Sequence, residues 1–359
     1  MKKYLFILIG FGLVFFAVGL VWGVWNHKKQ AEHLAMTTPL RILCGEKWLS
    51  NSVLEKFSKD HSVKIQQWTY TRPSEFLRQM ANADGKVDVI CTSSLLLKSL
   101  VHSHWLKKMD FQSLSNMRLV AVDFSHLPYD PMAEYSVPLF WTLYGFFGKG
   151  ESPKAETWKQ AWQSKRLSLW GEELNVLQIM TRMGMNIEEL LQEEENSRSR
   201  KSLDDEVKHF TKNAVHFLKP DPAPMSAESM MAKAEWIQLP LARVANLLGE
   251  SSPYTFWLPE DGATLEVGVL AVGEKSTQPD LAMELINELI SSEEAMETHK
   301  RLGAGVVHSS LSGLNSISPW QKPEALRRFP LNRLLFPSLN IEALPRFQKI
   351  FDDTVAAEY

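Results

Sequence analysis

The chain has 359 residues, of which 45% are hydrophobic and 23% are charged, and its formal net charge is −3. This is the composition of an ordinary globular protein, long enough for a sizeable core and for about two domains. No strongly basic balance points to nucleic acid as a partner. The two cysteines, Cys44 and Cys91, make neither a disulfide framework nor a metal-ligand spacing.

The first 30 residues form a targeting or anchoring segment. Lys2 and Lys3 precede an uncharged apolar run, Tyr4–Trp25, which as a helix would span roughly 33 Å and could cross a bilayer. Two interpretations stay open. Small residues at 17–19 fit a cleavable signal peptide, whereas the apolar run continues to Trp25, as in an uncleaved membrane anchor. Either way, we expect the rest of the chain on the periplasmic or extracellular side of the cytoplasmic membrane.

From residue 40 the pattern alternates between strand and helix. Leu54 and Phe57 share one face of the first expected helix, and Pro73 stands near the start of the second. Such alternation favours right-handed crossovers and a largely parallel sheet. The expected strands cover 40–44, 63–68 and 87–91, and the expected helices cover 51–59, 73–81 and 94–100.

The segment 135–150 is dense in aromatic and β-branched residues, which favour an extended backbone. Pro138 confines it to a strand edge, a strand start or a break, and Gly145 and Gly148 permit bends. Taken alone, the segment is either a buried strand of one large domain or a strand that leaves one lobe for another.

A second α/β region follows. The charged stretch 188–205 is typical of a solvated helix and loop. The expected helices cover 157–163, 172–184, 280–291, 293–302 and 343–356, and the expected strands cover 167–170 and 264–272. Two α/β regions joined by the long strands 135–145 and 264–272 indicate a hinged cleft with a ligand between two lobes.

Six segments match, in order, those of a known family. They are LRILCGEKWLSNSVLEKFSKDHSVKI (40–65), KVDVICTSS (86–94), LPYDPMAEYSVPLFWTLYGFFGKG (127–150), TWKQAWQSKRLSLWGEE (157–173), HFLKPDPAP (216–224) and WLPEDGATLEVGVLAVGEKSTQPDLAMELINELISSEEAME (257–297). With these segments the chain resembles the periplasmic polyamine-binding proteins, the spermidine/putrescine receptors of ABC importers, over about residues 40 to 355. The segment 127–150 is the best match, because it is similar to the family's FDP…YSVPYFWG crossover.

The resemblance implies an α/β, two-lobed periplasmic-binding-protein fold, type II-like. Each lobe is then a mostly parallel sheet flanked by helices, and two crossover strands join the lobes. Lobe 1 would comprise 38–140 plus 268–317, and lobe 2 would comprise 141–267 plus 318–359. The implied function is that of an extracytoplasmic solute-binding protein whose lobes close on a ligand and whose closed form docks on an ABC permease. No cofactor or metal is expected.

The ligand positions of the family are largely altered here. An aromatic survives in the first loop as Trp48, and a serine hydroxyl after the third strand survives as Ser93. The return strand's Trp-x-Asp falls on Glu266 and Gly268, so the aspartate that receives an ammonium group is absent. An acidic pair of the second lobe falls on Glu172 and Asn175, which keeps one carboxylate of two.

A polyamine needs spaced carboxylates and aromatic faces. Three carboxylates and three indoles fall near the implied cleft, so one hypothesis is a cationic or amine-bearing solute. The other is that the glutamates are solvated at the rim and the tryptophans belong to the core. The three indoles are Trp48, Trp141 and Trp170. The candidate ligand-binding residues are Glu46, Trp48, Ser93, Trp141, Glu172, Asn175 and Glu266.

Other functions have less support. A degenerate receptor fold that acts as a membrane-tethered sensor or protein-interaction module is the main alternative. No catalytic motif appears, and the histidines lack metal-ligand spacing. His308 alone falls in a segment that faces the implied cleft. Cys44 and Cys91 end strands expected to be neighbours, and they are either a disulfide or, as the geometry of parallel strands favours, two small buried residues.

Overall fold

The computed structural model describes residues 38–150, 157–162, 167–170, 216–218, 231, 234–249, 251–329, 333–341, 344, 348 and 352. The apolar run Tyr4–Trp25, the expected helix 172–184 and most of the expected terminal helix lie outside them. In the described part of the chain, no helix combines the length and apolar character needed to cross a membrane.

The first lobe alternates strand and helix as predicted. Strand β1 pairs in parallel with β2 on one side and β3 on the other, which places Leu43 beside both Trp68 and Ile90. The helix predicted at 73–81 differs at its start, because Pro73–Glu75 form a single 3-10 turn before the α-helix. The elements are β1 (Leu40–Gly45), α2 (Asn51–Asp60), β2 (Ile65–Tyr70), α3 (Phe76–Asn82), β3 (Val89–Ser93), α4 (Ser94–His102) and β4 (Leu106–Lys107).

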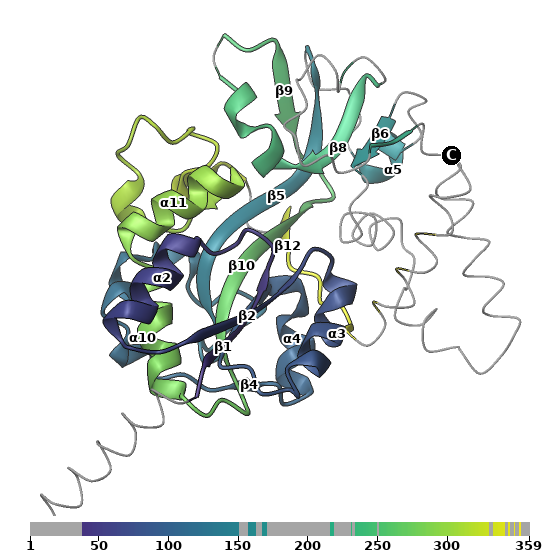
Figure 1. Ribbon diagram of the computed structural model, residues 1–359. Coiled ribbons are helices and arrows are strands. Elements are labelled where there is room, and N and C mark those ends of the chain that lie inside the picture. Colours follow the sequence, from purple (N-terminus) through teal and green to yellow (C-terminus); the bar gives the residue numbers. More distant parts are fainter. Residues whose placement is uncertain are drawn as a thin grey trace, which may run out of the picture.

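Two long buried strands, β5 (Val137–Lys149) and β10 (Ala263–Gly273), run through the centre of the molecule (Figure 1). The first part of β5 pairs antiparallel with β10, and its last part pairs with β8 (Trp236–Pro240) and β9 (Tyr254–Trp257). The other end of β10 pairs with β3. Both strands therefore connect the two halves of the sheet, as predicted for crossovers.

Pro138 explains an irregularity in this pairing. The register between β5 and β10 shifts at Gly268/Val269, where Leu139 is left without a partner between Phe140 and Pro138. Proline has no N–H to donate to a strand ladder, and bulges are where strands tolerate it. The bulge bends β5 as it passes from one half of the sheet to the other.

The second half of the sheet is also built on parallel pairs. Strand β6 (Leu167–Trp170) pairs in parallel with β7 (His216–Leu218) and with β8, and the short helix α5 (Trp158–Trp162) lies near it (Figure 1). The strand order is β2-β1-β3-β10-β5-β8-β6-β7. The predicted fold class, two mostly parallel half-sheets joined by two crossover strands, is confirmed.

Helices cover both faces of the first half-sheet. Figure 1 shows α2, α10 (Pro279–Leu289) and α11 (Ser292–Leu302) on one side, and α3 and α4 on the other. Ser291 caps the start of α11, and Gly303 ends it in the left-handed conformation with φ 64°, as a C-terminal glycine does. Strand β11 (Gly305–Val306) then pairs with β5.

The C-terminal segment packs against β10 and α4. After a 3-10 helix at Pro323–Arg328, strand β12 (Leu334–Leu335) pairs with the start of β10. The Leu339 N–H then donates to the Leu95 carbonyl at 2.8 Å, and the Ile341 N–H donates to Ser99 Oγ at 3.2 Å. These contacts join the end of the chain to α4.

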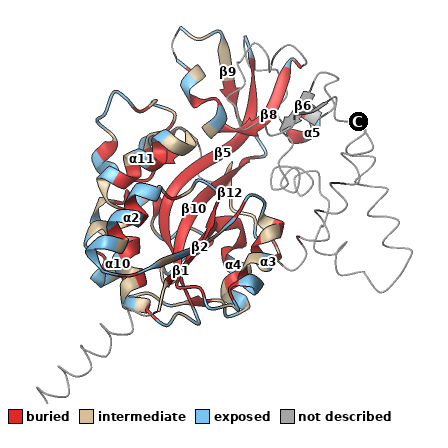
Figure 2. Cartoon of the chain, viewed as in Figure 1, coloured by how far each residue is buried: buried red, intermediate tan, exposed pale blue. Residues whose placement is uncertain are grey.

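The core has two large parts, one on each face of the sheet. Because side chains alternate along a strand, Leu43 and Ile90 enter the cluster under α3 and α4, whereas Cys44 and Cys91 enter the cluster under α2 and α10. Figure 2 shows the central strands buried along nearly their whole length. Both cysteines are fully buried free thiols, and burial is the largest of the causes that raise the pKa of the Cys44 thiol.

Candidate functional site

The candidate site lies where β1 and β3 end and where β5 and β10 pair. In open α/β sheets, ligands bind outside the carboxyl ends of the strands. Ser93, the last residue of β3, pairs with Gly268 of β10, which in turn pairs with Phe140 of β5. Two positions further along the same face, Glu266 pairs with Thr142. The sheet thus aligns a hydroxyl, an aromatic ring and a carboxylate along one face.

The loop after β1 carries two of the predicted residues. The Glu46 N–H donates to the Tyr70 carbonyl at 2.8 Å, and the Trp48 N–H donates back to the Gly45 carbonyl at 3.1 Å. Between them Lys47 adopts a left-handed conformation with φ 64°. The turn leaves the Glu46 side chain exposed and the Trp48 indole partly exposed, so both residues offer surface to a solute.

Trp48 is held in a small aromatic cluster. Its ring meets the Phe140 ring edge-on, with centroids 4.7 Å apart, and lies 6.5 Å from the Tyr70 ring. It also folds back over Gly45, where a Cβ would collide with the indole 2.5 Å away. Edge-to-face geometry of this kind is a preferred arrangement of aromatic rings. Glycine at position 45 is therefore what allows this placement of Trp48.

Ser93 and Glu266 are nearly buried polar groups. The Ser93 hydroxyl caps α4 by accepting a bond from the Leu95 N–H at 3.3 Å. The Glu266 carboxylate, 6% exposed, accepts a hydrogen bond from the Tyr144 hydroxyl at 2.6 Å. Because Tyr144 belongs to β5 and Glu266 to β10, this bond joins the two crossover strands.

The structure places Trp141 away from this face. Its side chain points to the opposite side of β5, is fully buried, and donates from Nε1 to the Val306 carbonyl at 3.0 Å. In this conformation it offers no surface to a solute, in line with the second hypothesis for the tryptophans. Glu172 and Asn175 lie outside the described residues. The structure therefore places Ser93 and Glu266 in the row formed by β3, β10 and β5, and Trp48 against Phe140 of that row. Glu46 lies in the loop that carries Trp48.

Phe140 and Tyr144 belong to the site but were not predicted as site residues. Both lie within the segment 135–150, where the sequence shows no clear alternation of polar and apolar residues because almost every residue is buried. Strand parity was the available signal, since Phe140, Thr142 and Tyr144 share a face whereas Trp141 does not.

His308 lies in the core near this region. It is fully buried, and neither of its ring nitrogens has a hydrogen-bond partner among the described residues. Burial lowers the pKa of the imidazole, and the nearby backbone of Ile290 acts in the opposite direction. Burial therefore favours the neutral form of the ring.

Comparison with known proteins agrees with this geometry, although no family model matches the chain. The chain is 24% identical over 283 residues to the spermidine/putrescine-binding periplasmic protein of Escherichia coli, which covers 76% of this chain and 78% of the relative. It is 23% identical over 284 residues to the protein of the same name in Salmonella typhimurium, with the same coverage.

Solved structures show the same fold. The TpPotD lipoprotein of Treponema pallidum superposes with a TM-score of 0.60 at 17% identity, covering 88% of this chain and 98% of that one. The spermidine/putrescine ABC transporter substrate-binding protein PotD of Streptococcus pneumoniae also gives 0.60, at 13% identity, covering 89% and 99%.

The fold is that of the two-lobed substrate-binding proteins of ABC transporters. Within that class, the chain resembles the spermidine/putrescine-binding periplasmic proteins, and the resemblance predicted from the sequence is confirmed.

Proposed function

We propose that the chain is the extracytoplasmic solute-binding component of an ABC importer, and that its solute is a cationic amine. The observation that carries the proposal is the pair of crossover strands, β5 and β10, which join two half-sheets and bear a buried carboxylate where they pair. The curated relatives that cover three quarters of the chain are named as binding proteins for polyamines.

Glu266 and Trp48 would bind the solute. Glu266 lies on the same face of β10 as Gly268, two residues before the position where the resembled family carries an aspartate. Its carboxylate, fixed by Tyr144, would receive an ammonium group. Trp48 and Phe140 would pack against the apolar spacer, and Trp48 would add a cation–π contact. Glu46, Ser93, Glu172 and Asn175 would complete the site.

The mechanism would be closure of lobe 1 (38–140 plus 268–317) on lobe 2 (141–267 plus 318–359). A solute shifts the open-to-closed equilibrium only by its differential affinity for the closed state. The closed form would then dock on the permease. Residues 1–30 would direct the chain to the outer side of the cytoplasmic membrane and, if uncleaved, tether it there.

Titration calorimetry and thermal shift on the full chain test this function. The panel comprises putrescine, spermidine and other di- and polyamines, with 1,4-butanediol as an uncharged control of putrescine's length. A solute at a hundredfold excess over Kd should stabilise the protein by about 2.7 kcal/mol. Binding of the diol as tightly as the diamine, or of no amine at all, would contradict the proposal.

Removing the charge of a single glutamate tests whether its carboxylate binds the amine. Glu266→Gln should weaken binding of the amine by about 2 to 5 kcal/mol, because a buried ammonium group would lose its partner. Glu172→Ala tests the second carboxylate in the same way. The exposed Glu55 of α2 offers the matched control, since Glu55→Gln should leave the affinity unchanged.

A further inference from the structure

Helix α11 reaches across to the loop that carries Glu46 and Trp48. Arg301, in its last turn, donates from Nε to the Lys47 carbonyl at 2.7 Å and from Nη2 to the Trp48 carbonyl at 2.8 Å. Nη2 also donates to Thr298 Oγ1 at 3.0 Å, one turn back on the same helix. One guanidinium group therefore donates hydrogen bonds to two successive carbonyls of the loop and is itself held by a hydrogen bond within its own helix.

The loop needs such a partner. Lys47 has φ 64°, a conformation that costs a residue with a side chain free energy unless its surroundings fix it. Within the loop, the Trp48 N–H closes a turn on Gly45. The carbonyls of Lys47 and Trp48 have their described partner in Arg301. The planar fork of a guanidinium group can serve both carbonyls at once, whereas the ammonium group of lysine acts as a point donor.

A second contact fastens the far end of the same loop to α11. Ser50, which follows the loop and caps α2, donates to the carboxylate of Glu294 at 3.2 Å. Glu294 is itself only 8% exposed. Arg301 and Glu294 are seven positions apart on α11, so residues about two turns apart on one helix hold the loop and the residue that caps α2 after it.

We propose that Arg301 is a positioning residue that fixes the conformation of the Glu46–Trp48 loop for solute binding. The consequence for solute binding rests on the proposed function, whereas the effect of Arg301 on the loop conformation does not. Held by Arg301, the Trp48 ring stays edge-on to Phe140 at the end of β1. Released, the loop samples other turns and the indole leaves this orientation.

Hydrogen exchange of the full chain tests the effect on the loop. The reporters are the amides of Glu46 and Trp48, which are bonded to Tyr70 and Gly45. In Arg301→Gln, their exchange should accelerate by about tenfold or more, as expected when a local opening loses charge-assisted bonds. The amides of β3 should keep their rates. Lys300→Gln is the matched control, because Lys300 is on the same helix but bonds only to Glu297 among the described residues.

Arg301→Lys separates positioning from charge. Because lysine keeps the charge but not the fork, this variant should behave like Arg301→Gln in loop exchange. Full rescue by lysine would overturn the proposal, as would unchanged exchange in Arg301→Gln.

The affinity for the best amine of the panel completes the test. It should fall by about tenfold in Arg301→Gln and stay constant in Lys300→Gln. Faster loop exchange with unchanged affinity would overturn the positioning role. If the wild-type chain binds no amine, the proposed function fails, and loop exchange alone decides whether Arg301 holds the loop.

Discussion

Gly268 of β10 packs directly against the Phe140 ring of β5. It stands where the resembled family carries an aspartate, and a Cβ built on it would overlap the Phe140 ring more closely than real atoms allow. In this conformation an aromatic ring covers the backbone at position 268. Glu266, on the same face of the strand, supplies the carboxylate that remains.

Gly268→Ala should therefore destabilise the protein by about 1 to 3 kcal/mol, the usual cost of overpacking a filled core. The measurement is urea unfolding followed by circular dichroism. Gly249 provides the control, because it is exposed and a Cβ there meets nothing within 4 Å. Equal stability of Gly268→Ala and Gly249→Ala would show that Phe140 yields freely and does not define this part of the site.

His308 should make stability fall in mild acid. Its folded-state pKa is lowered by burial, whereas the unfolded histidine titrates near pH 6.5. Below about pH 6.5 the unfolded chain takes up a proton that the folded chain refuses, so its contribution is present at higher pH and is lost as the pH falls. The loss is at most about 1.4 kcal/mol per pH unit.

His308→Leu removes this dependence. Its free energy of unfolding, measured at pH 8 and at pH 5, should change less between the two values than that of the wild type. Parallel pH profiles for the two proteins would mean that the imidazole is protonated equally in the folded and unfolded states.

At the scale of elements, the bond between Tyr144 and Glu266 joins the crossover strands. Tyr144→Phe should cost about 1 to 3 kcal/mol, because it removes the donor to a buried carboxylate. Tyr129→Phe is a matched control. Tyr129 is equally buried, but its hydroxyl has no partner among the described residues, so its loss should be neutral or slightly stabilising. Guanidinium unfolding of both variants checks the difference, and equal effects would contradict it.

The elements themselves were largely predictable, for physical reasons that differ between them. Helix α11 was predicted to within one residue because Gly303 ends it. Strand β10 was predicted equally well because its long apolar run lacks the polar positions of an amphipathic helix. The start of α3 was missed because proline at 73 permits either a 3-10 or an α-helical first turn.

The site was less predictable than the fold. Trp48 and Glu266 were proposed from the resemblance, because one follows a recognisable strand and the other lies within one. Arg301 could not, because its partners are the carbonyls of residues 47 and 48, and backbone acceptors leave no trace in a sequence. Trp141 was assigned to the site because the resemblance places it near the implied cleft, whereas strand parity puts it on the other face.

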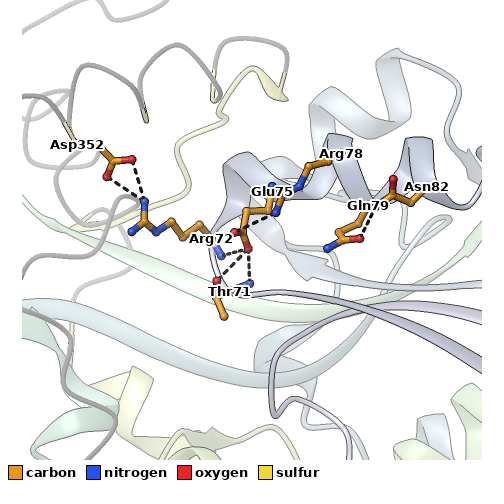
Figure 3. Close-up of polar contacts among 7 residues, drawn as sticks. All are labelled: Thr71, Arg72, Glu75, Arg78, Gln79, Asn82 and Asp352. Carbon is orange, nitrogen blue, oxygen red and sulfur yellow. Dashed lines mark hydrogen bonds and ion pairs between the residues drawn. The ribbon is translucent and has the colours of Figure 1, made fainter.

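At the scale of the whole molecule, two kinds of contact attach the C-terminal segment to the rest of the structure. Figure 3 shows the exposed one, in which Arg72, two residues after β2, bonds to both carboxylate oxygens of Asp352 at 2.9 and 3.1 Å. The buried one is apolar: Leu339, Ile341 and Leu344 enter the cluster that contains Leu95 and Leu100 of α4. Since the side chains of Arg72 and Asp352 are 46% and 47% exposed, water and salt screen their attraction.

The apolar contact should therefore dominate. Ile341→Ala is expected to cost about 2 to 5 kcal/mol, because it leaves a cavity beside α4, and Asp352→Asn is expected to cost less than about 1 kcal/mol. Urea unfolding at low and high salt measures both, and only the small effect of Asp352→Asn should fade with salt. If Asp352→Asn proved as costly as Ile341→Ala, the end of the chain would be held by charge, and its attachment to α4 would loosen at high ionic strength. If both were negligible, the segment after β12 would contribute nothing to the stability of α4.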